Sequence, residues 1–205
     1  MQKKKLTGKE SFTFQGQNAP ESVHDFWAWA LSRLLMDGPR GDLAEYIVRL
    51  ALGEDTATPK RGWGECDIVC RDGRKIEVKS SSYLQEWERD KPSWPVFSIA
   101  KTTSCDIAEV NGCYRYIGRD GQPPKRHSDA YIFCLFACAE RDAAEPLDLG
   151  QWHFYLMRTA DINARFGDQR SVSIPALEKA NAVSCGFGEL RKELDKLLPP
   201  KGDEL

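Results

Sequence analysis

Residues 65–79 of this 205-residue chain read ECDIVCRDGRKIEVK and have the pattern of a β-hairpin. Two runs in which apolar and polar residues alternate flank the turn sequence RDGR. Alternation with a period of two sends Ile76 and Val78 to one face of a strand, and Glu77 and Lys79 to the other face. The pattern therefore predicts two neighbouring strands that carry an acid and a base on the face away from the core.

The turn sequence decides which residue lies opposite Glu77. A two-residue loop at the dipeptide DG would place Asp67 opposite Val78, on the wrong face. A three-residue loop at RDG, with Gly73 in the left-handed conformation, places Asp67 opposite Glu77. Glycine in the third position is typical of the longer loop, so we expect both carboxylates at one place.

Two carboxylates beside an ammonium group indicate a particular chemistry. Mg²⁺ prefers hard oxygen ligands and commonly takes one or two carboxylates, with waters and substrate phosphates completing its shell. A lysine beside the ion can hold the attacking water or help to deprotonate it. Asp67, Glu77 and Lys79 therefore predict phosphodiester hydrolysis. The alternative is a solvated strand face on which Glu77 and Lys79 form an ordinary charge pair.

The spacing of these residues resembles a known signature. An Asp, about ten residues, and then Glu-x-Lys on the next strand is similar to the motif of the PD-(D/E)xK nucleases, the restriction-endonuclease-like superfamily. Cys66 stands where the family name has a proline. The resemblance covers roughly residues 40–100 and, more loosely, the strand that follows Ser128.

The resemblance implies roles for four residues of the hairpin. Asp67 and Glu77 would bind Mg²⁺ or Mn²⁺, and the main-chain carbonyl of Val78 would be a further ligand. Lys79 would position the attacking water. The activity implied is that of a metal-dependent nuclease, with DNA as the expected substrate. The alternative is a catalytically silent module of the same fold that binds nucleic acid or a protein partner.

The family usually adds an acid from a preceding helix, and residues 41–53 fit that description. Their apolar residues recur at helical spacing, and Gly53 follows as a C-cap. Glu45 lies beside the apolar stripe and would join the metal site. On the alternative interpretation, Glu45 is an exposed acid that pairs with Arg49, four residues along the helix.

Residues 80–87, SSSYLQEW, resemble the polar helix start that follows Glu-x-Lys in several branches of the family. In those branches a Gln or Tyr supports the site. Ser81, Tyr83 and Gln85 are therefore expected as supporting residues, and ordinary surface positions are the alternative.

Basic residues interleaved with aromatic ones suggest where nucleic acid would bind. Such contacts supply phosphate binding and base stacking. We expect residues 114–127 to border the same cleft as Glu77, although a solvated loop is the alternative. The net charge of −2 does not resemble that of a nonspecific polyanion binder. The expected nucleic-acid-binding residues are Arg61, Arg115, Arg119, Lys125 and Arg126.

The order of elements predicts the fold class. Residues 1–18 are lysine-rich and polar and are expected to form a flexible arm, followed by a single domain over residues 19–205. Helices are predicted at 21–36, 41–53, 159–166, 175–180 and 187–198, and further strands at 94–100, 130–137 and 152–158. This order favours a three-layer α/β core, in which a mixed β-sheet is flanked by helices.

Composition indicates the compartment and the partners. No apolar run approaches the roughly 20 residues of a membrane span, and no secretory signal is visible. Seven cysteines, an odd number, favour free thiols and a cytoplasmic location. Cys66 and Cys70 are better explained as buried residues than as zinc ligands. Nucleic acid is the expected partner, and a homodimer could close the cleft.

Overall fold

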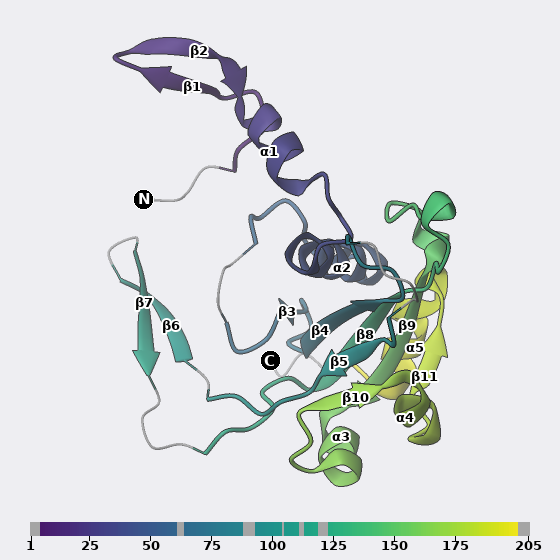
Figure 1. Cartoon of the computed structure of the whole chain (residues 1–205). Coiled ribbons are helices and arrows are strands. Elements are labelled where there is room, and N and C mark those ends of the chain that lie inside the picture. Colours follow the sequence, from purple (N-terminus) through teal and green to yellow (C-terminus); the bar gives the residue numbers. More distant parts are fainter. Residues whose placement is uncertain are drawn as a thin grey trace.

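The computed structural model describes residues 5–60, 64–87, 93–103, 105–110, 113–118 and 123–200 (Figure 1). For 105–110 and 113–118 the description is of the backbone. Three short 3₁₀ helices, which supplement the elements below, are Arg141–Ala143, Leu149–Gln151 and Phe187–Glu189. None of the helices in these ranges is long and apolar enough to cross a membrane.

A mixed β-sheet of five strands, in the order β11-β9-β8-β4-β3, forms the centre of the protein. Strands β4 and β8 run parallel, and the other neighbouring pairs are antiparallel. The predicted mixed α/β class, with helices flanking the sheet, is confirmed. The strands are β3 (Ile68–Val69), β4 (Lys75–Ser82), β8 (Ala130–Phe136), β9 (Trp152–Arg158) and β11 (Val183–Cys185).

One face of the sheet packs against helices α2 (Asp37–Leu52) and α5 (Leu190–Leu197). Ile76 and Val78 of β4 belong to this cluster, as the period-two pattern predicts. Their side chains meet apolar residues of α2, so the helix that carries Glu45 lies over the strand that carries Glu77.

The opposite face packs against α3 (Thr159–Phe166), α4 (Ile174–Lys179) and a two-stranded ribbon. The ribbon pairs β5 (Val96–Ser98) with β10 (Ser171–Ser173). Every residue of β8 is buried because both of its faces are covered. This arrangement explains why the sequence of β8 is a continuous apolar run rather than an alternating one.

The hairpin between β3 and β4 has the predicted register. Ile68 pairs with Ile76, and the same step along the ladder places Asp67 opposite Glu77. Cys70 N–H donates to the carbonyl of Arg74 over 2.8 Å, which closes a three-residue loop. Gly73 has a φ of 78° in that loop, so it adopts the left-handed conformation.

Arg74 ties this hairpin to the end of the chain. Its side chain is 1% exposed, and its guanidinium lies 2.6 Å from a carboxylate oxygen of Asp72. It also donates to the carbonyl of Leu198 over 2.8 Å. A buried cation of this kind is tolerated only with partners, so Arg74 joins the turn to the segment that follows α5.

Helix α2 begins earlier than the sequence suggests. Asp37-Gly38-Pro39 was expected to separate two helices, yet these residues form the first turn of α2. The first turn of a helix has no intrahelical partners for its N–H groups, so Pro39 costs no hydrogen bond there. The helix ends as predicted, with Gly53 as a left-handed C-cap at a φ of 64°.

The segments outside the sheet differ most from expectation. Residues 11–22, of which 11–18 were expected to belong to a flexible arm, form a hairpin of β1 (Ser11–Phe14) and β2 (Gln17–Ser22). Helix α1 (Val23–Leu31) follows and is shorter than predicted. A second hairpin joins β6 (Cys105–Val110) to β7 (Cys113–Gly118), and Figure 1 shows both hairpins projecting from the sheet.

The left-handed loop can be tested by two glycine substitutions. Gly73→Ala forces a Cβ into a positive φ and should lower the free energy of unfolding by about 1 kcal/mol. Gly41 lies inside α2 with no atom within 4 Å of an added Cβ. Gly41→Ala should therefore raise the free energy of unfolding by up to about 1 kcal/mol. Urea titration followed by circular dichroism measures both, and an unchanged Gly73→Ala midpoint would contradict the loop conformation.

Candidate active site

Asp67 lies where β3 separates from β4. The backbone ladder between the two strands ends at Ile68, and the N–H of Val78 then donates to Oδ2 of Asp67 over 2.7 Å. The carboxylate thus takes the place of the next main-chain acceptor, through a hydrogen bond strengthened by its charge. Asp67 is thereby held beside β4, just beyond the end of the β3–β4 ladder, where it is half-buried.

Helix α2 holds the backbone of Asp67 from one side. Arg49, in the last turn of the helix, donates from Nη2 to the carbonyl of Asp67 over 2.8 Å. The sequence did not suggest this contact, because Arg49 had a nearer candidate partner in Glu45. The arginine therefore couples the position of α2 to that of the hairpin.

Glu77 and Lys79 project from β4 on the face opposite Ile76 and Val78. Lys79 Nζ lies 2.6 Å from Glu77 Oε1, and their side chains are 29% and 19% exposed. Burial raises the pKa of Glu77, the negative charge of Asp67 raises it further, and Lys79 opposes both effects. Glu77 is therefore a partly buried carboxylate that lies within the electrostatic field of Asp67.

Glu45 approaches from α2 and is buried. Its Oε1 lies 2.6 Å from Lys60 Nζ, and the same ammonium lies 2.6 Å from Asp42. Burial raises the pKa of Glu45, Lys60 counteracts this, and the charge of Asp67 raises the pKa again. The expected alternative, an exposed acid paired with Arg49, does not describe this residue.

Three carboxylates, from α2, from the residue before β3 and from β4, therefore share one electrostatic neighbourhood. Asp67 is central, because its charge acts on Glu45 on one side and Glu77 on the other. Each carboxylate has a protein donor: Lys60, the Val78 N–H or Lys79. Within the described ranges, no three His, Cys, Asp or Glu side chains form a preassembled set of metal ligands.

The expected supporting residues act on the backbone near the site. Ser81 is buried and accepts from the N–H of Val96 over 3.2 Å, which ties β4 to β5. Gln85 donates to the carbonyl of Ser82. Tyr83 packs against the hydrophobic residues on the sheet face that α3 and α4 cover. Residues 80–82 are the end of β4, and residues 83–87 form bends and irregular structure, so the helix start suggested by the family resemblance is absent from this segment.

Arg126 does not fit the expected role in nucleic-acid binding. It is 6% exposed, and its guanidinium donates four hydrogen bonds to protein oxygens. It stabilises the loops around α3, and its burial leaves little of the side chain accessible to a phosphate. Its acceptors are the carbonyl of Ile99, Oδ1 of Asn163, and the carbonyls of Gly167 and Gln169.

The other expected basic contacts lie around the β6–β7 hairpin or before β3. Lys125 is exposed, and its backbone forms a bridge with Thr102. Arg115 lies in β7, where the backbone alone is described. Arg61 and Arg119 fall outside the described residues, so their expected contacts stay predictions.

Sequence comparison adds no family to this description. No model of a known protein family matches the chain, and no curated protein matches it either. The chemistry of the site is therefore argued from the residues themselves.

The central position of Asp67 can be tested by carboxyl titration in nuclear magnetic resonance. Asp67→Asn removes the charge and keeps an oxygen that can accept from Val78, so the pKa values of both Glu45 and Glu77 should fall. Asp42→Asn is the matched control, because Asp42 raises the pKa of Glu45 and is not among the causes of the shift at Glu77. The pKa of Glu45 alone should fall in the control, and an unaltered Glu77 titration in Asp67→Asn would rule out a shared neighbourhood.

Proposed function

We propose that this chain is a metal-dependent nuclease that hydrolyses phosphodiester bonds, with DNA as the expected substrate. The observation that carries the proposal is the grouping of Glu45, Asp67 and Glu77 around the open edge of β4, with Lys79 beside Glu77. Perturbed pKa values cluster at functional sites, and the raised pKa values of Glu45 and Glu77 support the proposal. The PD-(D/E)xK resemblance assigns the same residues.

The donor set suits a hard divalent cation. Carboxylate oxygens and a main-chain carbonyl are the ligands that Mg²⁺ and Mn²⁺ prefer. Asp67, Glu77 and the carbonyl of Val78 would hold the ion, and Glu45 would add a contact through water. A cation at this place would also offset the repulsion that raises the pKa values of Glu45 and Glu77.

When bound, the metal would polarise a phosphoryl oxygen and lower the pKa of a bound water. The protein supplies position and charge around that chemistry. Lys79 would orient the attacking water and stabilise the negative charge that develops on the phosphoryl group. The bond from Val78 to Asp67 would hold one carboxylate ligand in place throughout.

A second candidate is a nuclease-fold module that binds nucleic acid or a protein without cutting it. The observation in its favour is that Lys60, the Val78 N–H and Lys79 already neutralise or bond the three carboxylates. Carboxylates with protein donors of this kind do not need a bound metal or a catalytic role to remain charged in the fold. On either candidate we propose a cytoplasmic location, which suits the free thiols of the described chain.

The two candidates differ in how metal binding and cleavage respond to substitution. Asp67→Ala removes an anionic ligand, so Mn²⁺ affinity should fall at least about 10-fold, and cleavage should fall with it. Lys79→Ala removes a cation, so it should spare or strengthen metal binding while slowing cleavage by about 10²-fold to 10³-fold. Calorimetric titration with Mn²⁺ and a plasmid-nicking assay measure the two quantities.

Lys196→Ala is the matched control, because Lys196 also forms a 2.6 Å ion pair, with Glu193, but on α5. It should change neither quantity. Unchanged Mn²⁺ binding in Asp67→Ala would reject the metal site. A wild-type protein that binds nucleic acid without nicking it would favour the second candidate.

A further inference from the structure

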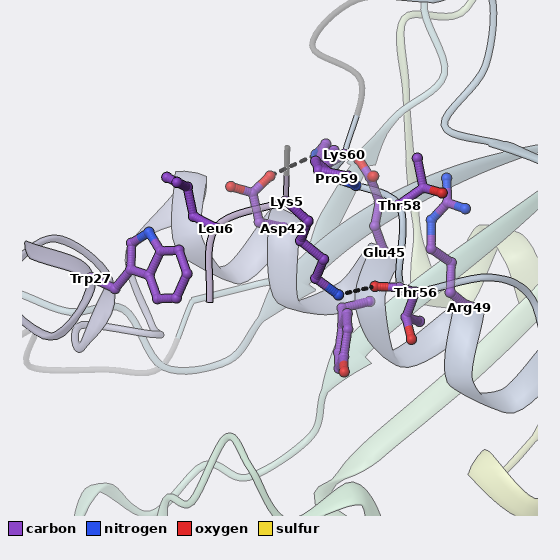
Figure 2. Close-up of a pocket in the computed structure, with 11 residues that line it drawn as sticks. Lys5, Leu6, Trp27, Asp42, Glu45, Arg49, Thr56, Thr58, Pro59 and Lys60 are labelled. Atoms are coloured by element: carbon purple, nitrogen blue, oxygen red, sulfur yellow. Dashed lines mark hydrogen bonds and ion pairs between the residues drawn. The ribbon is translucent and has the colours of Figure 1, made fainter. Parts of the chain in front are cut away.

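A pocket of about 500 Å³ lies beside the candidate active site, between the N-terminal segment and helix α2 (Figure 2). Glu45 belongs to its lining and is also one of the three carboxylates of the site. The pocket therefore adjoins the place where a phosphodiester would react. Its volume falls within the range of roughly 300 to 1,000 Å³ that is usual for small-ligand sites.

One end of the pocket is apolar and aromatic. Figure 2 shows Trp27 of α1 and Leu6 at this end. Tyr46 of α2, which follows Glu45 in the chain, adds a second aromatic ring to the pocket lining. A Cβ on Gly8 would lie 3.2 Å from the ring of Trp27, so the backbone of the N-terminal segment packs closely against the indole. Tyr46 is 48% exposed and is free of the core. Such surfaces are suited to stacking a planar ring.

The other end is polar and charged. Figure 2 shows Glu45, Lys60 and Arg49 here, away from Trp27. Lys60 bridges Asp42 and Glu45, so its ammonium offsets part of the negative charge of these two carboxylates. Arg49 donates a hydrogen bond from Nη2 to the carbonyl of Asp67. A guanidinium has five N–H donors, so Arg49 has others with which it could bind a phosphate. Lys5 adds a third cation, held to the carbonyl of Thr56 over 3.2 Å (Figure 2).

We infer that this pocket binds one unpaired nucleotide of the substrate strand, with the base against Trp27 and Tyr46 and the phosphate toward Lys60 and Arg49. The inference rests on the proposed nuclease function, and it adds a substrate class. An aromatic surface joined to an end that carries Lys5, Arg49 and Lys60 offers partners for the two halves of a nucleotide. A base inside a duplex would have to leave its stack and its partner to enter, which costs energy. The substrate is therefore a nucleic acid with a single-stranded segment or end at the site.

Binding without metal tests the pocket separately from catalysis. The probe is a fluorescein-labelled oligothymidylate of about 12 nucleotides, a length within the range that single-strand sites contact. Fluorescence anisotropy in EDTA measures its affinity for the full-length protein. Tyr46→Ala and Trp27→Ala should each weaken binding by roughly 5-fold to 150-fold, the effect of losing one stacking surface. Tyr46→Phe and Trp27→Phe keep a ring and should recover most of the affinity.

Matched controls come from the same two helices. Trp29 on α1 is 84% exposed and Leu50 on α2 is 43% exposed, and neither lines the pocket. Trp29→Ala and Leu50→Ala should bind the probe as the wild type does. A blunt duplex of the same length should bind more weakly than the single strand, and free thymidine monophosphate should compete for the site.

The inference is overturned if Tyr46→Ala and Trp27→Ala bind like the wild type, if the controls lose as much affinity, or if the duplex binds as tightly as the single strand. Its failure is distinct from that of the proposed function. Metal-dependent nicking with unaltered binding in the Tyr46 variant would reject the pocket alone. Single-strand binding that depends on both rings, in a protein that cuts nothing, would reject the nuclease and keep the pocket.

Discussion

The hydrogen bond from the N–H of Val78 to Oδ2 of Asp67 connects the fold to the candidate chemistry. It occurs because β3 is only two residues long and leaves β4 with an unpaired donor. A buried N–H without an acceptor is costly, so the ladder needs an acceptor at this position, and the carboxylate of Asp67 supplies it. The bond places that carboxylate at the sheet edge, between α2 on one face and Glu77 on the other.

The three acids around this hydrogen bond contribute little to the stability of the folded state. Burial and mutual repulsion raise the pKa values of Glu45 and Glu77, which means that the fold works against their charged forms. Lys60 and Lys79 offset part of that cost. Replacing buried charges by apolar residues often leaves a protein equally or more stable, so this group contributes little to the stability of the fold. Arg74 and Arg126 are the contrasting case. Both are buried cations whose hydrogen bonds to main-chain carbonyls connect distant parts of the fold.

The pocket and the carboxylate group share Glu45, and both depend on how α2 sits over the edge of the sheet. Arg49 holds one end of that arrangement through the carbonyl of Asp67. Leu6 of the N-terminal segment lines the pocket together with Trp27 of α1. A region expected to be a flexible arm therefore contributes to the surface next to the site.

Local patterns were sufficient for the hairpin and for much of the secondary structure. Alternation at residues 76–79, the glycine of the three-residue loop and the cap at Gly53 each act within a few residues, so β4, its register and the end of α2 could be predicted. The same holds for β9 and α3, whose bounds match those predicted.

Contacts between distant residues were decided by packing alone. Glu45 pairs with Lys60 and not with Arg49, and Arg126 is buried among loop carbonyls, because the placement of α2 and α3 on the sheet determines which groups meet. A sequence pattern specifies which face a side chain occupies, but the partner and the degree of burial follow from how whole elements pack.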